Sequence, residues 1–129
     1  MGKKHIVSLK DAITGVLHGG QGVFRVLIDE ESCGARHFSL LVNTMNAGAK
    51  GAEHGHDVEH CLYILSGKGT AHVDGEPSAI GPGTAVFIPA NILHKVEAGP
   101  EDLTYVVIYA PPGPEQQLKQ RGERAFEAQ

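Results

Sequence analysis

The chain has little of several residues on which common protein classes depend. Its 129 residues include no tryptophan and only two cysteines, Cys33 and Cys61, which are too few for a disulfide framework. No apolar segment follows Lys3 and Lys4 near the N-terminus. We therefore expect neither a signal peptide nor a membrane span, and the expected compartment is the cytoplasm.

A cluster of basic residues is missing as well. The 11 lysines and arginines are scattered along the chain, and the formal net charge is −4. Nucleic-acid binding requires a Lys/Arg surface that displaces counterions from phosphates. We therefore expect no nucleic-acid partner, and the apolar pattern predicts no membrane partner. A small-molecule ligand or substrate is the partner expected instead.

Glycine, by contrast, is abundant, with 17 residues that separate short apolar runs. This pattern predicts one all-β domain of about eight or nine short strands, a small sandwich or barrel. For a chain of this length, about two-thirds of the surface is expected to be buried, which suffices for a core. We expect the core over residues 22–110, an N-terminal arm over 1–21 and a C-terminal tail over 111–129.

Several segments have more specific expectations. Residues 4–9 could form a strand, followed by a short helical turn with Ser8 as its cap. Residues 30–36 read as a polar hairpin connection. The tail reads as a short polar helix or frayed end with too few apolar residues for the core. Residues 61–67 are apolar on both faces, so one face requires a second sheet or another subunit as cover.

Three histidines, His54, His56 and His60, fall within seven residues at even intervals. On an extended strand, even spacing places all three side chains on one face. Imidazole binds transition metals near neutral pH while staying uncharged. The spacing therefore predicts a metal site that needs a partner from elsewhere in the chain; the competing interpretation is a solvated surface strand.

Residues 48–67 resemble the first motif of the cupin superfamily, G-x5-H-x-H-x3–4-E-x6-G. Gly48 and Gly67 bound the motif, His54 and His56 match its two histidines, and His60 stands where the family usually has glutamate. Glutamate at position 59 has the wrong parity for the site. Residue 60 is therefore the one departure from the first motif.

The second cupin motif, G-x5-P-x-G-x2-H-x3-N, is present in altered form. Gly83, Pro89 and His94 match it, Asn91 replaces its glycine and Ala98 its closing asparagine. Asparagine tolerates a left-handed turn, so the first change is mild. The resemblance covers residues 36–110 and implies a single-domain jelly roll, or double-stranded β-helix, with a metal held by His54, His56, His60 and His94.

The resemblance also sets expectations for the cofactor. Four neutral imidazoles would leave a divalent metal its full charge, whereas the usual three histidines and one glutamate would lower it. We expect one divalent transition metal: Mn, Fe, Ni, Co or Cu. Zinc is the alternative, and a tetrahedral zinc would be saturated by four histidines and closed to substrate.

Three functions stay open at this point. The first is an oxidoreductase of the dioxygenase type, acting on a small substrate that chelates the metal through oxygen. The second is a metal-dependent lyase or isomerase of a small acid or sugar, and the third is a non-catalytic binding module. A lyase needs a general base; the candidates, which the sequence does not place, are Tyr63, Tyr105, Tyr109, Glu59 and Glu97. Cupins commonly pair, so a homodimer is expected.

The other conspicuous residues are expected to have structural roles. We expect surface positions for His5, His18 and His37, a structural role for His72, and solvated strand faces for Arg25 and Lys95. Ordinary core positions are expected for Phe38, Phe87, Tyr105 and Tyr109. No catalytic residue is assigned from the sequence.

Overall fold

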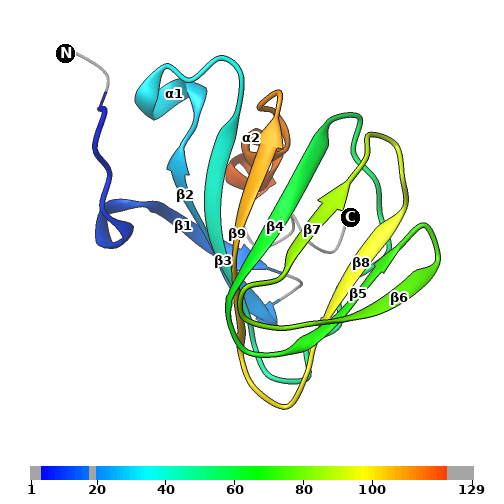
Figure 1. The fold of residues 1–129 in the computed structure, drawn as a ribbon. Helices are drawn as coiled ribbons and strands as arrows, with labels where there is room; N and C mark the ends of the chain where they lie inside the picture. Colours follow the sequence, from blue (N-terminus) through cyan, green and yellow to red (C-terminus); the bar gives the residue numbers. More distant parts are fainter. Residues whose placement is uncertain (1–3, 18–19, 122–129) are drawn as a thin grey trace.

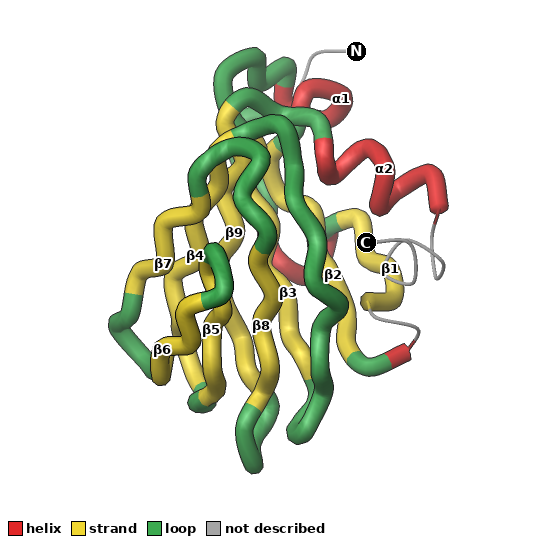
Figure 2. The backbone as a smooth tube through the Cα atoms, turned by 90° about the vertical axis from the view of Figure 1, so that its right-hand side faces the viewer, coloured by secondary structure: helices red, strands yellow, loops and turns green. Residues whose placement is uncertain are grey.

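The computed structural model describes residues 4–17 and 20–121, and it places them in two antiparallel sheets packed as layers (Figures 1 and 2). One sheet has six strands in the order β1-β2-β3-β9-β4-β7, and the other has three in the order β6-β5-β8. The strands are β1 (Ile13–Leu17), β2 (Gly22–Ile28), β3 (Ser39–Met45), β4 (Glu59–Ser66), β5 (Gly69–Val73), β6 (Glu76–Ile80), β7 (Ala85–Ile88), β8 (His94–Ala98) and β9 (Leu103–Ala110). The predicted all-β jelly roll is confirmed.

Alternation along the strands decides which side chains form the core. Phe24 and Val26 of β2 are buried on the inner face of the six-stranded sheet. On the same face, three buried residues stand side by side across neighbouring strands: Leu41 of β3, Val107 of β9 and Leu62 of β4. This row faces β5 and β6, which contribute Ala71 and Ile80 to the same core. Burial between the two sheets is thus the main stabilising term of the fold.

Left-handed backbone shapes several turns, among them three that the sequence itself indicates. Asp74 (φ 54°) and Gly75 (φ 80°) join β5 to β6, as expected for an Asp-Gly hairpin. Asn91 has φ 66°, which confirms that asparagine serves in place of the motif glycine. Gly67 has φ 85°, and a Cβ there would lie 2.0 Å from the Asp102 carbonyl oxygen, so the closing glycine of the first motif is a steric requirement.

The N-terminal segments differ from expectation. Residues 5–8 form no strand, and the predicted turn is a 3-10 helix, η1 (Leu9–Asp11), whose N-cap Ser8 makes no side-chain cap hydrogen bond. The expected hairpin connection contains a helical turn, α1 (Glu30–Cys33). It forms because the buried Asp29 accepts a hydrogen bond from the Ser32 N–H. His18 lies outside the described residues.

The expectation that the C-terminal tail avoids the core is wrong. Helix α2 (Pro114–Arg121) buries Leu118 in the core, at 2% exposure, and Glu115 is fully buried. Glu115 accepts hydrogen bonds from the Ser39 hydroxyl (2.6 Å) and the Gly113 N–H (3.0 Å). Polar residues therefore hold this helix in place. No helix in the described ranges is long and apolar enough to cross a bilayer.

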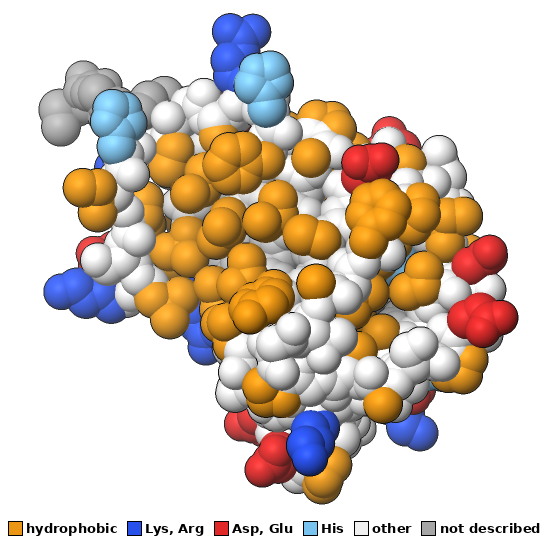
Figure 3. Space-filling model, in the orientation of Figure 1, with side chains coloured by type: hydrophobic (Ala, Val, Ile, Leu, Met, Phe, Trp, Pro, Cys, Tyr) orange, Lys and Arg blue, Asp and Glu red, His pale blue; other side chains and the backbone are white. Residues whose placement is uncertain are grey.

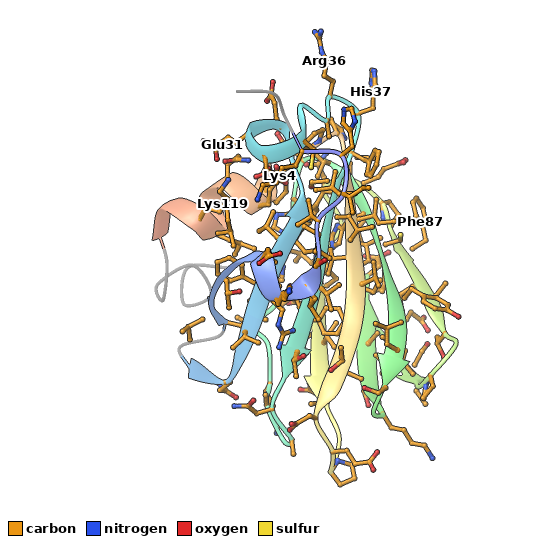
Figure 4. All side chains as sticks on the ribbon, turned by 90° about the vertical axis from the view of Figure 1, so that its left-hand side faces the viewer. Lys4, Glu31, Arg36, His37, Phe87 and Lys119 are labelled. Atoms are coloured by element: carbon orange, nitrogen blue, oxygen red, sulfur yellow. The ribbon has the colours of Figure 1, made fainter. Side chains whose placement is uncertain are left out.

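Helices α1 and α2 lie side by side at one end of the sandwich (Figure 2). Lys119 of α2 pairs with Asp29 (2.7 Å) and with Glu31 of α1, a contact seen in Figure 4. Burial alone would raise the pKa of Asp29, but the hydrogen bonds from Lys119 and Ser32 outweigh it and hold this pKa at about 2. The paired charges explain why so polar a helix can pack against the barrel.

The face of the six-stranded sheet that turns away from β5, β6 and β8, here called the outer face, is broadly apolar (Figure 3). Tyr63, Leu65 and Phe87 are 48%, 47% and 59% exposed, and Phe87 points away from the sheet in Figure 4. The half-buried Leu40, Val106 and Ile108 continue this face on the neighbouring strands β3 and β9. The expected core positions of Phe38 (40% exposed) and Phe87 are therefore wrong.

Candidate functional site

Four histidine rings converge at the end of the sandwich where β4 and β8 begin. His60 is the second residue of β4 and His94 the first of β8, and two backbone hydrogen bonds of 2.9 and 2.8 Å join His54 to His94. The ring centroids of His94 lie 4.3 Å from His54 and 4.6 Å from His60, and His56 lies 4.9 Å from His54. These four residues are called the histidine cluster below.

The cluster forms by a different route from the one the sequence suggested. Residues 51–58 are irregular apart from the bridge at His54, and β4 begins only at Glu59. The loop is instead positioned by hydrogen bonds: the Gly51 N–H donates to the Val96 carbonyl (2.9 Å), and the Asn91 N–H donates to the His56 carbonyl (2.6 Å). The three evenly spaced histidines do lie close together, although of the three only His60 lies on a strand.

The ring nitrogens are arranged as metal ligands would be. Ligand atoms of His54, His56 and His94 all lie within 4.8 Å of one another. The Nδ1 atoms of His54 and His94 contact the carbonyls of residues 52 and 92 at 2.8 and 3.0 Å. Because a carbonyl only accepts, each Nδ1 carries the proton and each Nε2 lone pair is free to bind a metal.

His60 adds an independent sign that a ligand belongs here. It is 5% exposed, and its Nδ1 has no hydrogen-bond partner among the residues that the structure describes. A buried polar atom without a partner is costly in a folded protein. Together with the Nε2 atoms of His54 and His94 and the nearby ring of His56, it makes the cluster chemically suitable for holding one divalent transition metal.

The histidines are neutral at physiological pH. Burial lowers the pKa of His60 to about 2 and the pKa values of His56 and His94 to about 4, and it also lowers the pKa of His54. For His60, the neighbouring rings of His94 and His56 add to the effect of burial. A metal would therefore not have to displace protons from the cluster at neutral pH.

A cavity opens beside the cluster, between the two sheets. It offers about 50 Å³ to the centres of water molecules, and its lining consists of Asn43, Gly51, His54, His60, Leu62, His94, Val96, Tyr105, Val107 and Tyr109. Among these described residues there is no carboxylate, lysine or arginine. The cavity is therefore neutral and partly apolar.

Two tyrosines, Tyr105 and Tyr109, belong to the buried core as expected, and both also line the cavity. Tyr109 lies directly opposite His60 on the neighbouring strand, with ring centroids 5.1 Å apart, and its ring is 5.5 Å from that of His56. Tyr105 lies two inward-facing positions further along β9. Burial raises the pKa of both hydroxyls, so both are protonated at neutral pH.

The other candidate bases lie elsewhere. Glu59 and Tyr63 are exposed, and Glu97 is bound to His72 (3.3 Å) across the outward side of β5 and β8. The structural role expected for His72 is thereby confirmed. His37 is exposed and points away from the barrel (Figure 4), as expected.

Arg25 is not simply solvated. Its guanidinium donates to the Thr44 hydroxyl (3.2 Å) on the outer face, away from the cavity. Arg25 therefore holds two neighbouring strands together and has no part in the site.

Asn43 is the cavity residue that the sequence reasoning missed. It is 4% exposed and stands directly opposite Tyr105 across β3 and β9. Burial raises the pKa of the Tyr105 hydroxyl, and the neighbouring Asn43 side chain partly offsets that rise. The signal was an amide at an inward-facing position between Leu41 and Met45, both fully buried. Such a position is normally apolar, so an amide there indicates a hydrogen-bonding role.

Comparison with known proteins agrees with this arrangement. The dimethylsulfoniopropionate lyase DddW of Ruegeria pomeroyi is 30% identical over 91 residues, which are 70% of this chain and 60% of the lyase. The polyketide cyclase RemF of Streptomyces resistomycificus superposes with a TM-score of 0.72 at 25% identity, covering 85% of this chain and 82% of RemF. KdgF from Halomonas sp. shares the fold, with a TM-score of 0.77 at 15% identity over 88% of this chain and 99% of KdgF. Residues 41–109 match the family model described as the cupin domain. The chain therefore belongs to the cupin domain family.

Proposed function

We propose that the protein is a metal-dependent enzyme that moves a proton on a small oxygen-bearing organic substrate, as in elimination, isomerisation or cyclisation. The observation that carries the proposal is the cavity itself, in which neutral histidines face the buried hydroxyl of Tyr109 with no charged lining residue. The lyase and the cyclase among the similar proteins support the same class of chemistry.

The ligands proposed for the metal are His54, His56, His60 and His94. A divalent metal held there would polarise a substrate oxygen as a Lewis acid, and it would keep its full double charge because all four ligands are neutral. Mn, Fe, Ni, Co and Cu are the candidates. Zinc in a closed tetrahedral site would be structural.

Tyr109 is the proposed acid–base residue. Its pKa is raised by burial, so its hydroxyl holds a proton ready to give to a leaving group or enolate oxygen. A positive charge bound by the neighbouring histidines would act in the opposite direction and bring this pKa down. The hydroxyl would then give up its proton more readily, and the phenolate that forms could accept one in turn. Leu62, Val96 and Val107 keep the space beside it apolar.

Replacing Tyr109 with phenylalanine tests this function. We expect kcat to fall about 100-fold or more, because general acid–base catalysis contributes at least that much, while metal content stays unchanged. Turnover would be screened without oxygen on metal-loaded protein, with dimethylsulfoniopropionate, small hydroxy acids and diketones as substrates. The matched control is Tyr63→Phe on the outer face; full activity of Tyr109→Phe would contradict the role of Tyr109.

Dioxygenase-type oxidation is the second candidate. The apolar lining of Leu62, Val96 and Val107 beside the histidine cluster favours it, since such a wall admits O₂. Turnover that stops without oxygen, with O₂ consumed in proportion to product, would select this class over the first. Ligand affinity without any turnover would instead indicate a binding protein.

We also propose that the outer face pairs two copies of the chain. Exposed and half-buried apolar side chains lie on β3, β9, β4 and β7 of this face. Such a broad apolar surface is unusual on a monomer and typical of subunit interfaces. Sedimentation should give twice the chain mass of 13.7 kDa, and Phe87→Arg combined with Tyr63→Arg should produce monomers because it buries unpaired charge. Leu93→Arg, at a residue that is 54% exposed near the loop containing Gly55, is the control and should leave the dimer intact.

A further inference from the structure

Asn43 carries a buried polar atom that the fold does not use. Its side chain lines the cavity at 4% exposure, and its Oδ1 has no hydrogen-bond partner in the described part of the chain. Tyr105 stands directly opposite Asn43 across β3 and β9 and lines the same cavity, and its hydroxyl can donate a hydrogen bond. The pair therefore presents one acceptor and one donor to whatever enters.

Asn43 and Tyr105 lie at the opposite end of the cavity from the histidine cluster. Tyr109 stands opposite His60, and Tyr105 stands opposite Asn43, four residues away along the same strand. Both ends line the same small cavity, so one short ligand can contact both. The wall between them is apolar, formed by Leu62, Val96 and Val107.

Size and charge limit what can occupy this space. A volume of about 50 Å³ for water centres holds about three to five waters, hence only a few non-hydrogen atoms. No described lining residue carries a charge that could pair with an ionised group, and burying an unpaired charge is strongly unfavourable. The end of the ligand that reaches Asn43 is therefore uncharged.

We infer that Asn43 and Tyr105 select the substrate by binding an uncharged tail that donates a hydrogen bond, such as a hydroxyl. The ligand class is a short molecule with an oxygen-bearing head for the metal, an apolar spacer of about two carbons and a hydroxyl tail. This inference rests on the proposed function, because the head must be held at the histidine cluster. It concerns recognition and is independent of which reaction follows.

Two probes of equal size test the inference: 3-hydroxypropanoate and butanoate, which differ in one hydroxyl against one methyl. Calorimetry on metal-loaded protein should show about tenfold or tighter binding of 3-hydroxypropanoate, because the analogue leaves Oδ1 unpaired. Asn43→Leu should bring the ratio close to one, with butanoate bound at least as well as by the wild type. Tyr105→Phe keeps the volume and should reduce the ratio partly; Thr44→Val, the next residue of β3 on the outer face, should leave it unchanged.

Metal content measured on the same samples distinguishes a failure of this inference from a failure of the proposed function. Equal affinity for both probes in metal-loaded wild type, failure of both to bind, or a preference that survives in Asn43→Leu would overturn the inference alone. Wild-type protein that takes up no metal would overturn the proposed function and this inference with it. A hydroxyl preference that is lost in Asn43→Leu while metal content is retained is the result we expect.

Discussion

Saturating the histidine cluster with its metal is expected to raise the melting temperature by about 10 °C. Binding to the folded state alone stabilises a protein by about 2.7 kcal/mol when the free metal is at 100 times Kd. For a domain of this size, each kcal/mol corresponds to about 3–5 °C. Thermal melts of chelator-treated protein with Mn, Fe, Co, Ni, Cu and Zn added in turn measure the effect and rank the metals.

Removing one ligand should abolish most of this stabilisation. His94→Ala and His60→Ala are each expected to weaken metal binding more than about 100-fold, since outer partners of metal ligands alone contribute 10–100-fold. Any metal-dependent turnover should fall by about 1000-fold or more, because the metal supplies several kcal/mol of transition-state stabilisation. His72→Ala and His37→Ala, both outside the cluster, are matched controls that should keep the metal.

His60 provides the sharpest version of this test. Its ring lies beside those of His94 and His56, but only His54, His56 and His94 bring ligand atoms within 4.8 Å of one another. His60→Glu should retain metal because the usual cupin motif has glutamate at this position. Wild-type metal content and melting temperature in His60→Ala would show that the site has three histidine ligands and that His60 is not one of them.

The sequence predicted best where local pattern and tertiary environment agree. The strand over residues 103–110 appears as β9 with those bounds, because its β-branched and aromatic residues suit a strand between two neighbours. The two motifs led to His94, which a backbone bridge holds beside His54. In this part of the chain the spacing of a few residues carries most of the information.

Prediction failed where a residue's role depends on distant partners. Leu118 and Glu115 of α2 are buried because β3 supplies Ser39 and the segment before α1 supplies Asp29. Composition alone could not show these pairings. In the same way, nothing local distinguishes Tyr109, which faces the histidines, from Phe87, which faces solvent; strand order across the sheet decides it.

Acidification is expected to destabilise the metal-free protein steeply below pH 6.5. In the folded state burial lowers the pKa of His60 to about 2 and of His94 to about 4, against an ordinary value of 6.5. Between these values and 6.5 the unfolded chain binds more protons than the folded one, so stability is fully present above pH 6.5 and falls with pH. Each buried histidine contributes up to about 1.4 kcal/mol per pH unit.

For His60 and His94 together, this amounts to about 4 kcal/mol at most between pH 6.5 and pH 5, a large part of a typical domain's 5–15 kcal/mol. Asp29, with a pKa of about 2, does not interfere, since its contribution to stability is lost only at lower pH. Urea unfolding of chelator-treated protein at pH 7.5, 6.5, 5.75 and 5 measures the slope. The double variant His60→Gln/His94→Gln should make the slope shallower, leaving the part due to His54 and His56. His37→Gln, at an exposed residue, should leave the slope unchanged. A wild-type unfolding free energy that is constant over this window would mean that the cluster is solvated in the absence of metal, because only buried rings resist protonation.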